Sequence, residues 1–142
     1  MALKLSAVVE GLRWSLDNEL VFINIETHKI LNCASPTFSD IPNDKILDEV
    51  EANKDKYIEL PLANEINQRK IAIEFVLSLD EGVVKDNLSK SLNNITFKKF
   101  YKLLDKYEYK DKWIQFRAKA LKEIAISFLN SKNIEFENDV YY

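Results

Sequence analysis

Four lysines between positions 98 and 106 are the side chains with the clearest potential for chemistry in this sequence. A helix over 97–107 turns about 100° per residue, so it separates an aromatic and leucine arc from a lysine arc. The lysine arc, called the lysine face below, consists of Lys98, Lys99, Lys102 and Lys106. Ammonium groups on one face can bind a polyanion and release its condensed counterions. A solvated face that only keeps the helix soluble is the interpretation that the pattern favours, because lysine is a poor specificity residue and the aromatic rings point toward the core.

Arg117 is the second candidate, because a helix over 111–130 places it in the middle of an apolar arc that includes Trp113. A guanidinium group cannot lose its proton, so it needs a partner or a route to solvent. We expect Arg117 to be mostly buried and bonded to Glu74, to Asp105 or to carbonyl groups at a helix end. The alternatives are an anion-binding arginine at the base of a groove and an arginine whose side chain extends past Trp113 to solvent. Arg117 therefore joins the lysine face in the candidate binding surface.

The sequence positions of the other potentially reactive residues indicate structural roles. His28, the single histidine, falls in a turn where its tolerance of positive φ is useful, although histidine could in principle serve as a base. Cys33 has no histidine or basic pair nearby and is expected to pack as a small apolar residue. The acids of 44–55 lack EF-hand spacing, and no P-loop, Rossmann glycine pattern or HExxH motif occurs. We expect no enzymatic activity, no cofactor and no metal.

Composition and charge describe an ordinary globular chain with an uneven surface. The 142 residues are 46% apolar and 30% charged, with two glycines and three prolines, which fits one domain with long helices. The net charge is −3, but 96–123 carries nine basic and four acidic residues, so this segment is +5 and the remainder is −8. The single cysteine favours a reducing compartment. The longest apolar run has three or four residues, against about 20 for a membrane span, and no signal peptide is recognisable. We expect a soluble, cytoplasmic protein without membrane contact.

The local patterns predict strands in the first half of the chain and helices in the second. A helix over 7–14, capped by Ser6, is followed by three strands, at 20–25, 30–33 and 57–60. A loop over 34–42 and an acidic helix over 43–52, capped by Asn43, separate the last two strands. Four helices should follow, over 64–79, 80–92, 96–107 and 111–130, and then a short edge strand at 134–136. Their expected caps are Asn64 for the first, Asp80 for the second, and Thr96 or Asn94 for the third.

Together these elements predict an α+β fold. A small antiparallel sheet, made of the N-terminal hairpin and a third short strand, packs on a C-terminal unit of three to four helices. We expect a single domain over 1–142, with a sheet-rich half at about 1–61 and a helical half at about 62–132. The helix over 64–79 is apolar on most sides, which is typical of a central helix. One aromatic cluster between the last two helices should contain Phe97, Phe100, Trp113, Phe116 and Phe128.

A set of short motifs in a fixed order resembles one known family. The motifs are the hairpin turn at Thr27, Tyr57-Ile58-Glu59-Leu60-Pro61, Phe97-Lys98-Lys99-Phe100-Tyr101, Trp113-Ile114-Gln115-Phe116-Arg117 and Leu121-Lys122-Glu123-Ile124-Ala125. This order resembles the bacterial uncharacterised protein family UPF0158 over about 5–137. The family's turn usually reads threonine-glycine, whereas this chain has Thr27-His28. The resemblance implies a bacterial protein and no assigned activity.

The sequence therefore predicts a non-enzymatic interaction or regulatory protein with a protein partner. The alternative function is anion or nucleic-acid binding through the lysine face.

Overall fold

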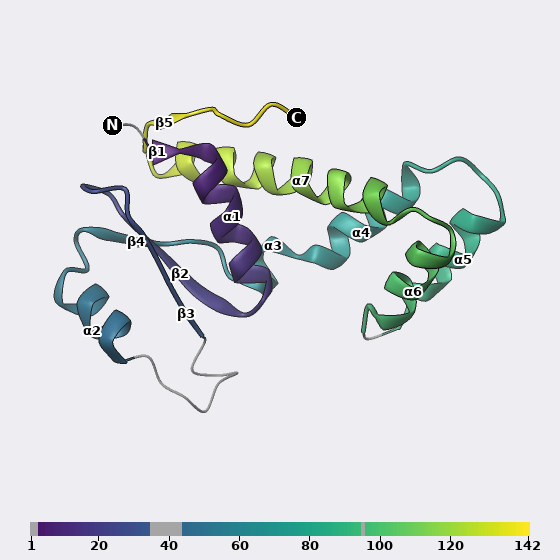
Figure 1. Cartoon of the computed structure of the whole chain (residues 1–142), viewed down its shortest axis with the longest axis horizontal. Coiled ribbons are helices and arrows are strands. Elements are labelled where there is room, and N and C mark those ends of the chain that lie inside the picture. Colours follow the sequence, from purple (N-terminus) through teal and green to yellow (C-terminus); the bar gives the residue numbers. More distant parts are fainter. Residues whose placement is uncertain (1–2, 35–43, 95) are drawn as a thin grey trace. The chain divides into compact units, whose positions relative to one another are not determined.

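The computed structural model describes residues 3–34, 44–94 and 96–142 (Figure 1). The chain forms two compact units, which we call the sheet unit (Met1–Ile66 with Leu121–Tyr142) and the helical unit (Asn67–Ala120). The boundary between them falls within the long helix α7 (Lys110–Ser131), close to the predicted helix over 111–130. The α+β fold class is confirmed, with a three-stranded antiparallel sheet in the first half of the chain and helices in the second half. The predicted loop over 34–42 and the Asn43 cap fall almost entirely outside the described residues.

The sheet contains the three predicted strands in the order β3-β2-β4. They are β2 (Glu19–Asn24), β3 (Ile30–Ala34) and β4 (Tyr57–Glu59), and β2 pairs antiparallel with both neighbours. In the β2–β3 turn, His28 adopts a φ of 65° and donates its backbone N–H to the Asn24 carbonyl at 2.8 Å. This left-handed conformation is the one that glycine adopts without strain. The structure thus places His28 at the positive φ expected of this turn, a conformation in which histidine is enriched among residues other than glycine.

Helix α1 (Leu5–Leu16) packs on this sheet through Gly11. A Cβ atom at Gly11 would come within 2.7 Å of a methyl group of Leu60 and 3.2 Å of one of Val21. A glycine inside a helix costs roughly 1 kcal/mol relative to alanine, but at this position it lets the helix backbone approach the sheet closely. The core of the sheet unit forms around this contact, with Val8, Leu12 and Ile23 fully buried.

Segments from both ends of the described chain pair beside α1. Strand β1 (Leu3–Lys4) runs parallel to β5 (Phe136–Glu137), which corresponds to the predicted edge strand over 134–136. The prediction that Ser6 caps the first helix is wrong. Helix α1 begins at Leu5, and Ser6 donates both its backbone N–H (2.8 Å) and its hydroxyl (2.5 Å) to the Asp139 carboxylate. A carboxylate from a distant segment therefore satisfies the first turn of α1, where negative charge is favoured.

The predicted helix over 64–79 is divided at Asn67. The structure has α3 (Ala63–Ile66) and α4 (Gln68–Leu77), with Asn67 between them at φ 57° and ψ 69°. The Asn67 side chain accepts a hydrogen bond from the Lys70 backbone N–H at 3.2 Å, so Asn67 and not Asn64 caps α4. Asparagine tolerates the left-handed region and is a strong cap, while the apolar pattern continues across it and hides the break.

The expectation that this helix is buried on most sides is also wrong. Ile71, Ala72, Phe75 and Val76 are buried, but Ile73 is 44% exposed and Leu77 is 67% exposed. Only one face of α4 therefore contributes to the core of the helical unit.

The remaining helices lie close to their predicted positions, and two of them begin after residues other than the predicted caps. These remaining helices are α2 (Asp44–Ala52), α5 (Val83–Ser91) and α6 (Lys98–Lys106). Gly82 precedes α5 and Phe97 precedes α6, and neither provides a side-chain cap, so the predictions of Asp80 and of Thr96 or Asn94 are wrong. Among the described helices, none is long and apolar enough to cross a membrane.

A buried hydroxyl in α1 provides a test of the core. Ser15 is 1% exposed, and its hydroxyl has no hydrogen-bond partner in the described parts of the chain. Ser15→Ala removes a desolvated polar group and raises helix propensity, so we expect the free energy of unfolding to rise by about 1 kcal/mol. Urea unfolding followed by circular dichroism measures the change. A destabilised Ser15→Ala variant would contradict the placement of this hydroxyl in an apolar environment.

The contact between Ser6 and Asp139 predicts a pH dependence. The side-chain hydrogen bond from Ser6, and next its backbone N–H, lower the pKa of Asp139 below the ordinary value of 3.8. Because the folded pKa lies below the unfolded one, this stabilisation is present above about pH 3.8 and is lost as the pH falls through the folded value. We expect Ser6→Ala to be less stable than the wild type near neutral pH, and the difference to shrink in acid. NMR titration of the Asp139 carboxyl should show its pKa rising in Ser6→Ala, and an unchanged pKa would refute the contact.

Candidate polyanion-binding surface

The lysine face lies on the solvent side of α6. Lys98, Lys99, Lys102 and Lys106 are all exposed, while Phe100 and Leu104 on the opposite side are 0% and 1% exposed. None of the four ammonium groups takes part in an ion pair with a described residue. Four positive charges are therefore presented together without a carboxylate that neutralises them.

An aromatic cluster beneath α6 fixes the orientation of this face. The rings of Phe100 and Trp113 meet edge to face with centroids 5.5 Å apart, and Phe75 contacts Trp113 at 5.5 Å and Phe116 at 5.4 Å. Phe97 joins through Phe100 at 5.9 Å. Four of the five predicted members are thus linked, and Phe75 of α4 is the member that sequence analysis missed. The apolar pattern of α4 does not show which of its residues touches the indole.

The fifth predicted member, Phe128, is not in this cluster. It belongs to the sheet unit and lines a cavity of about 320 Å³ with Leu62 and Lys132. Phe128 lies on the same helix as Trp113, but the unit boundary after Ala120 separates them. A helical wheel compares angles only and cannot show that two residues on one arc belong to different cores.

Arg117 is half-buried, and its partner differs from the predicted one. Its Nη1 donates to the side-chain carbonyl oxygen of Gln68 at 3.3 Å, and the guanidinium lies 6.0 Å from the Trp113 ring centroid. No described carboxylate, Glu74 and Asp105 included, lies within ion-pair distance of it. The predicted partners of Arg117, a carboxylate or carbonyl groups at a helix end, are therefore wrong. Because the group is only half-buried, water, an amide oxygen and the ring face suffice to solvate its charge.

The Gln68 amide extends this contact to the surface of α6. Its nitrogen donates to the Tyr101 hydroxyl oxygen at 3.2 Å while its oxygen accepts from Arg117. Tyr101 is 41% exposed, so the expectation that the aromatic residues of this helix all turn toward the core is wrong for Tyr101. It lies about 100° around the helix from Phe100, at the edge of the apolar arc. That edge position is a signal in the sequence for an exposed ring, but it does not by itself decide between burial and exposure.

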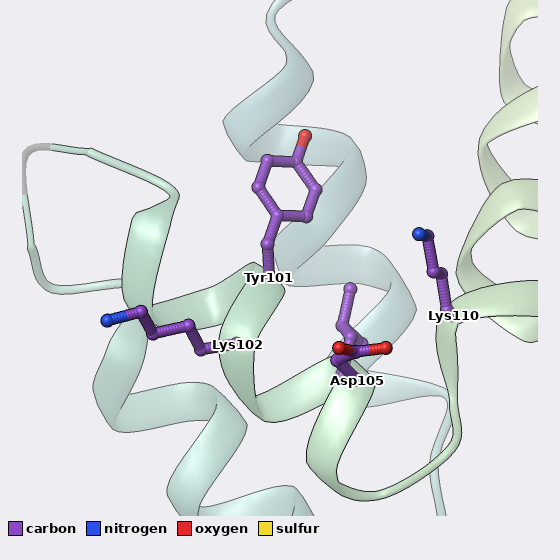
Figure 2. A pocket seen from close by; sticks show the side chains of 5 residues that line it. Tyr101, Lys102, Asp105 and Lys110 are labelled. Atoms are coloured by element: carbon purple, nitrogen blue, oxygen red, sulfur yellow. The ribbon is translucent and has the colours of Figure 1, made fainter.

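A shallow cavity adjoins Tyr101. It measures about 340 Å³ and is lined by Tyr101, Lys102, Leu104, Asp105 and Lys110. Figure 2 shows Asp105 one turn along α6 from Tyr101, with Lys110 beside them and Lys102 extending to the other side. No ion pair within the described chain involves Lys102, Asp105 or Lys110, so these charges remain available to a ligand.

The helical unit has a positive formal charge that comes from residues 96–120, because residues 67–95 contain four basic and four acidic residues. Its sequence contains 12 basic and seven acidic residues, a formal charge of +5, whereas the sheet unit has eight basic and 16 acidic residues, a charge of −8. Lysines also lie over tyrosine rings, Lys112 at 4.6 Å from the Tyr109 centroid and Lys106 at 5.7 Å from that of Tyr107. A polyanion is therefore attracted to the helical unit and repelled by the sheet unit.

The other reactive residues lie in structural positions. His28 is in the hairpin turn at positive φ, as predicted. Cys33 is 3% exposed, and burial, with a smaller contribution from the negative charge of Glu19, raises the pKa of its thiol. Burial also raises the pKa of Glu59, with a smaller contribution from Glu65. In the residues that the structure describes, no group of three histidine, cysteine, aspartate or glutamate side chains is placed to hold a metal ion.

The order of elements and motifs agrees with a known family. The sequence model of the uncharacterised protein family UPF0158 matches residues 1–140. The chain therefore belongs to this family, which confirms the resemblance seen in its motifs. No curated protein and no solved structure matches the chain.

The ring contacts predict which phenylalanines support Trp113. In a Trp14→Phe background, where Trp113 is the only indole, we expect Phe100→Ala to shift its fluorescence to longer wavelength and to cost roughly 3–5 kcal/mol of unfolding free energy. The milder Phe100→Leu should cost less than about 1.5 kcal/mol and should remain folded.

The control is Phe128→Ala, because Phe128 belongs to the other unit. This variant should leave the Trp113 emission of the folded protein unchanged. Equal spectral shifts in Phe100→Ala and Phe128→Ala would show that the cluster is assigned incorrectly.

Proposed function

We propose that this protein is a cytoplasmic bacterial protein without enzymatic activity that acts by binding an anionic macromolecule through its lysine face. The observation that carries the proposal is the exposure of Lys98, Lys99, Lys102 and Lys106 on one side of α6, with no ion pair to a described carboxylate. The lysine face supplies most of the formal charge of +5 of the helical unit, because the rest of this unit has eight basic and seven acidic residues.

Residue chemistry supports the non-enzymatic part of the proposal. His28 is fixed in a hairpin turn, and Cys33 is buried with a raised pKa, which disfavours the reactive thiolate. Neither residue lies in the cavity beside Tyr101. The lone, buried cysteine also supports a cytoplasmic location, where disulfides are rare.

Two classes of anionic partner fit the lysine face, an acidic protein surface and a nucleic acid. Both would form charge-assisted contacts with the ammonium groups, and both would be released by salt. The proposal therefore requires salt-sensitive binding that is lost with these four side chains.

The test compares two variants with the same change in net charge. The first is Lys98→Gln, Lys99→Gln, Lys102→Gln and Lys106→Gln combined. The matched control changes four exposed lysines of the sheet unit, Lys29→Gln, Lys45→Gln, Lys54→Gln and Lys132→Gln. The probes are a labelled single-stranded oligonucleotide of mixed sequence and a labelled poly-glutamate peptide, and fluorescence anisotropy is measured over a range of salt concentrations.

We expect the wild type and the control variant to bind at least one probe, and the lysine-face variant to bind neither. With the oligonucleotide, four phosphate contacts give a slope of log affinity against log salt of about −3, because each contact contributes about −0.7. Absence of binding by the wild type at low salt, or equal loss of binding in both variants, would refute the proposal.

A further inference from the structure

We infer that the anionic macromolecule is a single-stranded nucleic acid, and that Tyr101 stacks on one of its bases beside the lysine face. This inference rests on the proposed polyanion-binding function and names the class of its partner. The aromatic rings of α6 were expected to point into the core, where no base could reach them. The exposure of Tyr101 removes this objection to base recognition.

The Tyr101 ring is held in place and open on one side. It contacts the rings of Phe97 and Phe100, each with centroids 5.9 Å apart, and it is 41% exposed. Lys98 precedes it by one turn and Lys102 follows it directly, so phosphates held by these lysines would lie near the exposed ring. A basic surface with an aromatic side chain among the charges is the arrangement that binds single strands.

A chain of hydrogen bonds fixes the ring further. The Gln68 amide donates to the Tyr101 hydroxyl oxygen at 3.2 Å and accepts from Arg117 at 3.3 Å. Because the tyrosine oxygen is the acceptor in this bond, its own proton remains available to a base. The stacking surface is thus formed before a ligand arrives, which reduces the entropic cost of binding.

The cavity next to the ring contains an acidic side chain. Asp105 lines the cavity with Tyr101 and Lys110, and its carboxylate disfavours a partner that presents only acidic groups. The exocyclic amino group of cytosine donates hydrogen bonds that a carboxylate accepts. Thymine instead offers one ring N–H between two carbonyl oxygens, which repel the carboxylate. The cavity therefore favours cytosine over thymine, and a base over an acidic protein side chain.

Single strands are favoured over duplexes for a geometric reason. In a duplex the bases are stacked on one another, so a ring on the protein surface cannot reach a base face. In a single strand the faces are available, and stacking on an aromatic side chain is tolerant of sequence.

The experiment separates contacts with bases from contacts with phosphates. Labelled oligo(dC), oligo(dT), an abasic strand and a duplex, each of about 12 nucleotides, are titrated with the wild type and variants by fluorescence anisotropy. Tyr101→Leu removes the ring, and Tyr101→Phe keeps it without the hydroxyl. Tyr141→Leu is the matched control, because Tyr141 is 94% exposed and lies in the sheet unit. Circular dichroism establishes that each variant is folded.

We expect the wild type to bind oligo(dC) more tightly than the abasic strand and the duplex. Tyr101→Leu should weaken oligo(dC) binding by roughly 5- to 150-fold and leave abasic-strand binding unchanged. Tyr101→Phe and Tyr141→Leu should retain the preference for bases. Asp105→Asn should remove the preference for oligo(dC) over oligo(dT), and its control Asp111→Asn should not.

Three outcomes would overturn the inference. They are equal wild-type affinity for oligo(dC) and the abasic strand, tighter binding to the duplex, and an unchanged oligo(dC) affinity in Tyr101→Leu. If one of these outcomes is found, but the wild type binds the poly-glutamate peptide and the lysine-face variant does not, the proposed function stands and this inference fails. If the wild type binds none of the polyanions, both fail.

Discussion

The edge-to-face contact between Phe100 and Trp113 determines how α6 is oriented in the helical unit. Their rings meet at an interplanar angle of 88°, and the two side chains are 0% and 2% exposed. A helix of nine residues does not form alone in water, because nucleation is unfavourable and too few hydrogen bonds follow it. Burial of Phe100 and Leu104 therefore holds α6 in place, and the 3.6-residue repeat then directs the lysines outward. The candidate binding surface is a consequence of core packing.

Polar contacts link the buried Trp113 to the exposed Tyr101. The guanidinium of Arg117 lies beside the Trp113 ring, the Gln68 amide bonds to Arg117, and the Tyr101 hydroxyl oxygen accepts from Gln68. Each partner is neutral or half-buried, so the chain avoids the desolvation penalty of a buried ion pair. A carboxylate partner for Arg117 would have neutralised positive charge near α6. The amide satisfies the arginine and leaves the charge of the helical unit unchanged.

Sequence patterns predicted those features that follow from periodicity within one element. The three strands of the sheet and the two faces of α6 lie as predicted, because alternation and the separation of lysines from leucines are strong local signals. The break at Asn67 was missed because one residue in a left-handed conformation does not interrupt an apolar pattern. The partner of Arg117 was missed because a wheel shows which side chains share an arc but not which neutral side chain from another helix lies opposite. Phe75 was missed for the same reason.

Tyr101 shows where the limit of such prediction lies. At the edge of an apolar arc, a few tens of degrees decide whether a ring is buried or exposed, and the packing of neighbouring helices sets that angle. Here Phe97 and Phe100 occupy the inner side of the ring, and Tyr101 remains 41% exposed.

The net charge of −3 conceals an uneven distribution of charge between the two units. The net charge alone predicts weak repulsion of any polyanion. However, the Debye length at physiological ionic strength is about 8 Å, which is shorter than the roughly 13 Å length of a nine-residue helix. A phosphate chain on α6 therefore interacts mainly with the lysines within a few ångströms. The excess of acidic residues in the sheet unit then has a second effect, because it repels the same chain from the rest of the surface. In the proposed function, charge of both signs would direct a polyanion to the lysine face, and added salt would weaken both the attraction and the repulsion.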